Sequence, residues 1–152
     1  MILTVHFDGA CNNNGDRKMG IGIWAFTGSY ENPLTVAEIA EYVGEGTSFK
    51  AEYYAAIEAF KFIKKYQASL RKKLGITEVR MFNDSESVVR QINGDYKISE
   101  PSIKILYDLV IVLRSQCSLN ITLTHVRREY NTQADVLSKE ALTYGRSNSQ
   151  VP

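Results

Sequence analysis

Four acidic residues stand where a fold of alternating strands and helices would bring them together. Asp8 closes a short β-prone stretch, and Glu52 opens a long helical pattern. Asp84 follows a second β-prone stretch, and Asp135 lies in the first turn of a last helix. Sites in α/β sheets gather outside the carboxyl ends of strands, where helix N-termini also point. We therefore expect the four carboxylates to meet at one edge of the sheet.

Each of these acids also has an explanation that needs no function. The helix macrodipole and helix capping favour acids at helix N-termini, which covers Glu52 and Asp135. Asp84 followed by Ser85 is typical of a helix cap. The hypothesis of a site therefore depends on all four acids converging, and the sequence supports that only through the predicted fold.

Converging carboxylates imply a bound metal ion. Four such groups cannot all stay ionised side by side without compensating charge. A hard divalent cation bound by oxygen atoms supplies that charge, and Mg²⁺ is the natural choice, with Mn²⁺ as a substitute. Two ions ~3.5–4 Å apart can activate a water and stabilise a leaving oxygen in phosphodiester cleavage. The pattern therefore predicts metal-dependent phosphoryl chemistry.

The elements that would position these acids can be read from hydrophobic periodicity and turn residues. A loop is expected at Gly28–Leu34, Thr47 or Ser48 is expected to cap the long helix, and Gly75 to end it. Strands are predicted at residues 2–8, 20–27, 37–46, 76–83 and 119–126, and helices at residues 51–74, 85–92, 101–115 and from 131 or 132 to 144. The order βββ-α-β-α-α-β-α predicts an α/β fold. Its five-stranded mixed sheet has three antiparallel strands first and helices on both faces.

Length and composition set the wider expectations. A chain of 152 residues suits one domain, at residues 1–144, followed by a flexible tail at residues 145–152. A net charge of +1 neither requires nor excludes a nucleic-acid partner. Cys11 and Cys117 form no zinc-binding pattern and favour a reducing compartment. With no signal-peptide pattern and no apolar run of ~20 residues, we expect a cytoplasmic monomer that does not enter membranes.

Four short motifs, in this order, resemble the type 1 ribonuclease H family across about residues 2–144. They are Phe7-Asp8-Gly9-Ala10-Cys11, Ala51-Glu52-Tyr53, Asn83-Asp84-Ser85 and Asn131-x-x-x-Asp135. The stretches Gln91–Lys97 and His125–Asn131 resemble the family too. The resemblance implies an RNase H-like fold and a two-metal-ion endonuclease. Such an enzyme hydrolyses the RNA strand of RNA/DNA hybrids and leaves 5′-phosphate and 3′-hydroxyl ends.

The resemblance also implies a role for each acid. Asp8 would bridge both metal ions, and Asp135 would complete the site of the ion that activates water. Glu52 and Asp84 would hold the other ion. Glu52 would also touch the RNA 2′-hydroxyl, the group by which a protein distinguishes RNA from DNA.

Two family features are missing from this sequence. The connection after Asn93-Gly94 has no room for the basic insertion that grips the DNA strand in many members, so we place the chain in the branch without it. The mobile-loop histidine is also absent. Arg128, whose fork can bind a phosphate, is the candidate for that role, with a solvated loop arginine as the equal alternative. His6 and His125 are interpreted as structural strand histidines.

Substrate contacts are predicted less closely than the acids. Ser48 and Phe49 stand where the family often has paired asparagines that read the minor groove. Ser48 can still donate a hydrogen bond, whereas Phe49 can only stack or pack. The nucleic-acid-binding candidates are Gly9, Ala10, Asn14, Ser48, Phe49, Ser85 and Arg128. The basic run from Lys61 to Lys73 is interpreted as a solvated helix end.

Two other functions stay open. One is a catalytically weak or inactive nucleic-acid-binding module of the same fold. The other is a nuclease of this fold that cuts double-stranded RNA or DNA ends, because metal ions do not read the sugar. A dinucleotide-binding enzyme is disfavoured, because Gly20-Ile21-Gly22 lacks a third glycine at the required spacing and does not open a helix.

Overall fold

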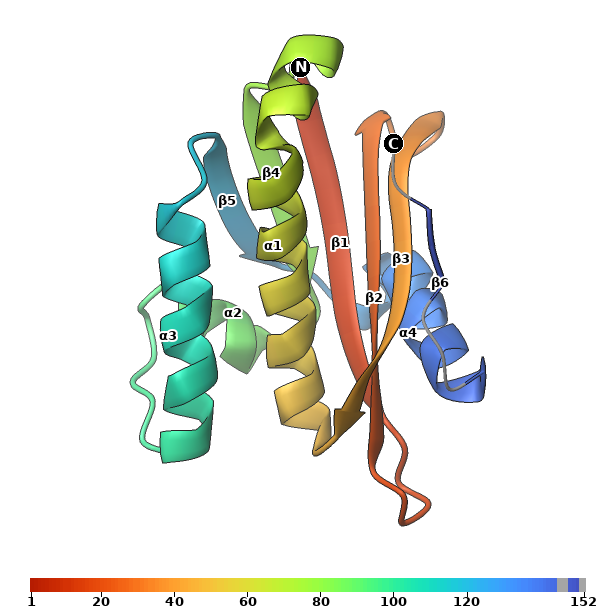
Figure 1. Cartoon of the computed structure of the whole chain (residues 1–152), viewed down its shortest axis with the longest axis vertical. Coiled ribbons are helices and arrows are strands. Elements are labelled where there is room, and N and C mark those ends of the chain that lie inside the picture. Colours follow the sequence, from red (N-terminus) through yellow and green to blue (C-terminus); the bar gives the residue numbers. More distant parts are fainter. Residues whose placement is uncertain (145–147, 151–152) are drawn as a thin grey trace.

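A mixed β-sheet carries helices on both faces in the computed structural model, which describes residues 1–144 and 148–150 (Figure 1). Its strands are β1 (Ile2–Cys11), β2 (Lys18–Gly28), β3 (Pro33–Glu45), β4 (Glu78–Asn83), β5 (Asn120–His125) and β6 (Asn148–Gln150). Its helices are α1 (Ser48–Leu74), α2 (Glu86–Ile92), α3 (Pro101–Ser115), α4 (Thr132–Tyr144) and a short 3-10 helix η1 (Arg128–Tyr130).

The strand order β5-β4-β1-β2-β3-β6 confirms the predicted fold class. β1, β2 and β3 pair antiparallel, while β4 pairs parallel to both β1 and β5. All five predicted strands are present. β6, which lies in the predicted tail, adds three antiparallel residues to the outer edge of β3. The remaining tail residues lie outside the described part of the chain.

Two predicted strand boundaries were wrong by three residues or more. β1 does not end at Asp8 but continues to Cys11, because β2 keeps pairing with it as far as Cys11 and Met19. β3 begins at Pro33 instead of residue 37, so the predicted loop shrinks to residues 29–32. A proline is tolerated there because it is the first residue of its strand.

The predicted helix ends are confirmed by their caps. The Thr47 hydroxyl accepts a hydrogen bond from the Lys50 amide at the start of α1, and Gly75 ends the helix in the left-handed conformation at φ 66°. Ser85 caps α2 in the same way as Thr47. Pro101 occupies the first turn of α3, where its missing N–H costs no hydrogen bond.

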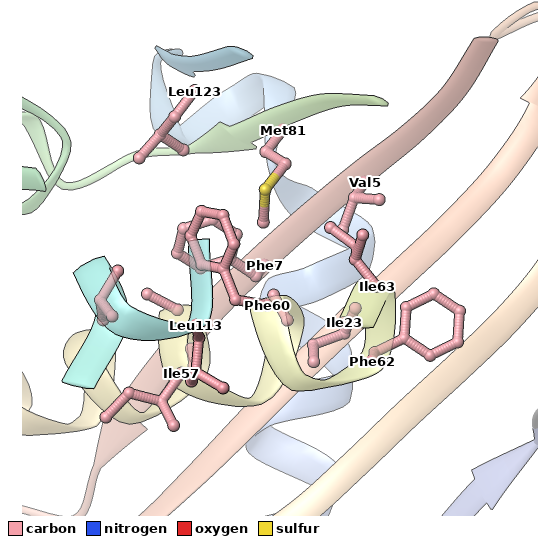
Figure 2. Packing of buried hydrophobic residues seen from close by; sticks show 14 of the residues in the cluster. Val5, Phe7, Ile23, Ile57, Phe60, Phe62, Ile63, Met81, Leu113 and Leu123 are labelled. Carbon is pink, nitrogen blue, oxygen red and sulfur yellow. The ribbon is translucent and has the colours of Figure 1, made fainter. Parts of the chain in front are cut away.

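The main core lies between the sheet and helices α1 and α3. Val5, Phe7 and Ile23 point from the sheet towards Phe60 and Ile63 of α1 (Figure 2). Each large apolar side chain buried in this way contributes about 1.5–3 kcal/mol. α4 covers the opposite face over a smaller cluster formed by Ala40, Leu137 and Ala141. The sheet is thus fixed from both sides.

None of the helices in the described residues has the length and apolar character needed to cross a membrane.

Candidate active site

The acidic site begins where β1 extends beyond β4. The parallel ladder between these strands ends at the pair His6 and Phe82, but β1 continues with β2 as its partner. Asp8 is the second residue beyond that end. Asp84 directly follows the last residue of β4. Asp8, on the part of β1 that extends beyond β4, and Asp84, just after the end of β4, therefore lie at the same edge of the sheet.

Two glycines bring the other two acids to this edge. A Cβ atom on Gly9 would lie 2.2 Å from the carbonyl carbon of Ala51, the residue before Glu52. A Cβ atom on Gly22 would lie 2.2 Å from the carbonyl oxygen of Ala134, the residue before Asp135. Glycine at both strand positions is what lets the first turns of α1 and α4 lie directly on the sheet. Since Gly22 pairs with Asp8, the α4 contact is made beside that acid.

The carboxylates converge as expected from the sequence. Oxygen atoms of Asp8, Glu52 and Asp84 all lie within 4.8 Å of one another. Asp8 is the most enclosed of them, with 4% of its surface exposed. Asp135 joins the group through a side-chain contact with Asp8, while its Oδ2 also accepts a hydrogen bond from Lys139 Nζ at 2.9 Å.

Without bound cations, this crowding opposes ionisation. Burial raises the pKa of Asp8 far above its usual range, and the charges of Glu52 and Asp84 raise it further. Burial also raises the pKa of Glu52, although hydrogen bonds from the Gly9 amide and the Asn83 side chain act in the opposite direction. The site thus concentrates negative charge that a cation would relieve.

A hydrogen-bond frame holds the acids in place. The Gly9 amide donates to Glu52 Oε1 at 2.6 Å, and Asn83 Nδ2 lies 3.4 Å from the same oxygen. Asn131 Nδ2 lies 3.4 Å from Asp84 Oδ1. Both asparagines are buried, with exposures of 0% and 1%, so their side chains are fixed by these contacts.

A cavity of about 440 Å³ opens over the carboxylates. It is lined by most of the predicted site residues: the four acids, Gly9, Ala10, Ser48 and Arg128. It is also lined by Cys11, Asn13 and Lys139, which were not predicted as site residues from the sequence. Lys139 could have been found from its spacing of four residues after Asp135, which places both on one helix face.

Three predicted substrate contacts do not line this cavity. Asn14 is exposed, and its side-chain oxygen accepts a hydrogen bond from the Asp16 amide at 3.4 Å. Phe49 packs against the core and meets the Tyr53 ring edge-on at 5.7 Å. Ser85 caps α2.

The two histidines lie apart from the acids. His6 is 2% exposed, hydrogen-bonded to Asn131 and Tyr30, and stacked on Phe82, which confirms its interpretation as a packed strand residue. His125 is the last residue of β5 and is exposed.

The donor set fits a divalent cation. Carboxylates from β1, from α1 and from the turn after β4 place oxygen atoms within reach of one ion, and Asp135 offers a fourth carboxylate beside Asp8. Oxygen-only ligand sets are those that Mg²⁺ and Mn²⁺ prefer. The arrangement can therefore hold hard cations next to a cavity open to substrate.

Comparison with known proteins points in the same direction. The family model described as reverse transcriptase-like matches residues 6–141. A ribonuclease HI of Halobacterium salinarum is 28% identical over 138 residues, which is 90% of this chain and 62% of that protein. A bifunctional protein of Mycobacterium tuberculosis is 29% identical over 143 residues, which is 93% of this chain and 36% of that protein. This chain thus spans less than two thirds of these curated relatives.

Two solved structures match this chain over nearly the full length of both chains. LC11-RNase H1, crystallised in complex with an RNA/DNA hybrid, is 31% identical with a TM-score of 0.78, and the match covers 94% of this chain and 98% of that one. RNase H1 from Halobacterium salinarum gives a TM-score of 0.77 at 26% identity, covering 95% of this chain and 99% of that one.

Proposed function

The chain belongs to the type 1 ribonuclease H family, and on this premise we propose that it hydrolyses the RNA strand of RNA/DNA hybrids as a metal-dependent endonuclease. The observation that carries the proposal is the convergence of Asp8, Glu52 and Asp84 within 4.8 Å, with Asp135 in contact with Asp8. The cavity above them supplies room for a phosphodiester backbone.

The four carboxylates would hold the cations, with Mg²⁺ as the proposed metal and Mn²⁺ as its substitute. Asp8, which lies against the other acids, would be a ligand of both ions. Bound there, two ions would supply an activated water and charge stabilisation for the leaving oxygen, giving 5′-phosphate and 3′-hydroxyl ends. Glu52 and Asp84 would serve one ion and Asp135 the other.

The chain's own residues would position the substrate. Arg128 is an exposed cavity residue whose guanidinium can bind a backbone phosphate bidentately. Ser48, exposed at the start of α1, can donate to the duplex from the same cavity. Gly9 and Ala10, which also line the cavity, would contact the backbone of the duplex. Contacts by Asn14, Phe49 and Ser85 need a duplex that extends beyond the cavity.

The RNA strand of a hybrid is favoured over other duplexes on two grounds. Glu52 has one oxygen held by the Gly9 amide, and its carboxylate would contact the 2′-hydroxyl of the RNA strand. The solved relative LC11-RNase H1 was crystallised with an RNA/DNA hybrid. Action as a monomer in the cytoplasm is part of the same proposal.

A substrate panel tests this function. The protein would be incubated with Mg²⁺ and end-labelled RNA/DNA, RNA/RNA and DNA/DNA duplexes of one sequence, with Asp8→Asn as the control. We expect cleavage of the hybrid's RNA strand alone, lost in the variant. Cleavage of RNA/RNA at an equal rate would assign a double-stranded RNA nuclease. Duplex binding without any cleavage would assign a binding module.

A further inference from the structure

A second cavity, of about 520 Å³, lies beside the catalytic one and is separated from it by η1. Arg128 of η1 lines the catalytic cavity, whereas Glu129 and Tyr130 of the same turn line the second. We call this second cavity the aromatic cleft. Its volume falls within the ~300–1,000 Å³ typical of small-molecule sites.

Aromatic rings form the walls of the aromatic cleft. Tyr30 and Tyr130 are 58% and 67% exposed. Tyr30 meets the rings of Phe26 and His6 edge-on, at 5.2 and 5.7 Å, and still keeps this exposed surface. Trp24 of β2 also lines the cleft; its ring stacks on Phe26 at 4.2 Å, and its indole N–H donates to Thr35 Oγ1 at 3.1 Å. Such surfaces suit a flat ring, and stacking on aromatic side chains contributes about 1–3 kcal/mol per nucleobase.

The charge of the aromatic cleft restricts what that ring can be. Glu129 is the only acid among the described residues lining it, and no lysine or arginine lines it. His6 also lines the cleft, but it is 2% exposed and its two ring nitrogens lie within hydrogen-bond distance of the Asn131 and Tyr30 side chains. A carboxylate repels phosphate but accepts hydrogen bonds from N–H donors. The wall therefore favours a neutral ring that carries adjacent N–H groups.

We propose that the aromatic cleft binds one unpaired nucleobase, stacked on Tyr130 and Tyr30 with its amino edge on Glu129. Guanine fits best, because its ring N–H and amino group can donate side by side to one carboxylate. Adenine and cytosine offer an amino group next to a ring acceptor, and uracil offers a single N–H. This predicts the order guanine first and uracil last.

A hydrogen-bonded chain links the aromatic cleft to the acids. Tyr30 Oη lies 2.8 Å from His6 Nε2, and His6 Nδ1 lies 2.9 Å from Asn131 Oδ1. The same asparagine lies 3.4 Å from Asp84. A strand leaving the catalytic cavity past Arg128 has only to cross η1 to present a base to the aromatic cleft. The base can thus come from an unpaired stretch of the substrate, which rests on the proposed function, or from a free nucleoside.

The chain's single tryptophan makes the proposal directly measurable, because Trp24 lines the aromatic cleft. Fluorescence of the metal-free protein would be titrated with guanosine, cytidine and uridine, corrected for absorption by the nucleosides. We expect saturable quenching that is strongest with guanosine. Tyr130→Ala should weaken guanosine binding by roughly 5- to 150-fold. Glu129→Gln should remove the preference for guanosine over uridine. The matched control Tyr96→Ala, an exposed tyrosine elsewhere, should change neither.

A second arm separates the two sources of the base. Hybrids with an unpaired guanine beside the duplex and blunt hybrids would be compared for quenching and affinity without metal, so that no cleavage occurs. Tighter binding of the overhang, lost in Tyr130→Ala, assigns the aromatic cleft to the substrate strand. Guanosine binding with no overhang effect assigns it to a free nucleoside. Absence of quenching by every nucleoside, or quenching untouched by Tyr130→Ala, overturns the proposal whether or not the protein cleaves hybrids.

Discussion

The side-chain amides of Asn83 and Asn131 both donate to the carbonyl oxygen of Phe7, at 2.8 and 3.0 Å. Asn83 ends β4, and Asn131 directly precedes α4. The shared acceptor belongs to the residue before Asp8, so the peptide that carries this acid is fixed by two other elements of the site. Because β4 has ended there, the two amides replace the ladder hydrogen bond that a further strand residue would provide.

Replacing either asparagine by alanine should damage catalysis more than folding. Each change removes a donor to a buried carbonyl, which costs about 1–3 kcal/mol in stability. Asn131→Ala also removes a hydrogen-bond donor to the Asp84 carboxylate, and Asn83→Ala removes one to the Glu52 carboxylate. We expect kcat for hybrid cleavage to fall roughly 10- to 100-fold, as is found for groups that orient metal ligands, with KM little changed.

Asn93→Ala is the matched control for both variants. Asn93 Nδ2 donates to the Leu123 carbonyl at 2.9 Å, away from the acids. Asn93→Ala should therefore lower stability by a similar amount but leave kcat unchanged. Urea unfolding and steady-state kinetics on the three variants decide the matter. Equal kcat losses in all three would show that these asparagines act only through general stability.

Gly9→Ala should separate α1 from β1. The added methyl group would lie 2.2 Å from the Ala51 backbone, which cannot move aside as a side chain would. Overpacking of this kind typically costs about 1–3 kcal/mol, and here it also displaces Glu52 from Asp8. Gly46→Ala is the control, because the nearest atoms to its methyl group belong to the flexible side chains of Met19 and Lys50 and not to backbone. We expect Gly9→Ala to lower both the melting temperature and the rate of hybrid cleavage. A fully active Gly9→Ala protein would contradict the account.

Asp8→Asn should stabilise the metal-free protein. The pKa of Asp8 is raised in the folded state, so its folding contribution is most favourable below the unfolded value of about 3.9 and is lost as pH rises towards the folded value. At neutral pH, where the unfolded carboxyl is ionised, folding of the wild type must either bury that charge beside other carboxylates or bind a proton, and both carry a free-energy cost. The amide removes it, and melting temperature should rise by roughly 2–4 °C for each kcal/mol recovered.

Magnesium should reverse that ranking. A ligand at 100 times its Kd adds about 2.7 kcal/mol to the stability of the form that binds it. The wild type should gain this stabilisation, and Asp8→Asn should gain much less. Melting curves at several pH values, with and without Mg²⁺, check both statements. A variant that is less stable than wild type without metal at neutral pH would refute the electrostatic account of the site.

Lys139→Met should strengthen metal binding. Lys139 is paired with Asp135 Oδ2 at 2.9 Å and therefore competes with a cation for that oxygen. An exposed pair of this kind contributes about 0.2–1 kcal/mol, so affinity should rise roughly 1.4- to 5-fold. Lys104→Met, which breaks an equivalent pair with Asp108 elsewhere, is the control. Calorimetric titration with Mn²⁺ measures both, and weaker binding by Lys139→Met would mean that the lysine supports the site instead.

The sequence predicted the parts of this protein that depend on local patterns. Thr47, Gly75 and Ser85 carry cap chemistry that acts within a few residues, and their elements begin or end as expected. The acids were found because strand ends and helix starts share one edge in this class of sheet. The continuation of β1 to Cys11 was missed, because it depends on how far β2 pairs and not on the local composition.

The supporting frame could not be read in the same way. Asn83 and Asn131 both contact the Phe7 carbonyl, from positions 76 and 124 residues away in the sequence. Hydrophobic periodicity cannot predict contacts of this kind. Asn131 was noted within a motif and as one possible start of the last helix, but the contacts of its side-chain amide with the Phe7 carbonyl and Asp84 were not predicted. The seating of α1 on Gly9 likewise appears only when the helix is in place. Long-range polar contacts thus escape the reasoning that finds the acids.

The rate of RNA-strand cleavage in an end-labelled RNA/DNA hybrid, measured with Mg²⁺ for the wild type and for Asp8→Asn, Glu52→Gln, Asp84→Asn and Asp135→Asn, tests the central claim most directly. Hybrid binding would be followed in parallel by fluorescence anisotropy. The account predicts that wild type cleaves the RNA strand and that each variant loses more than about 100-fold in rate, beyond the loss usual for groups that only orient ligands, while still binding the hybrid. A wild type that binds without cleaving, or variants that cleave as fast as it does, would contradict the assignment of these four carboxylates as the catalytic centre.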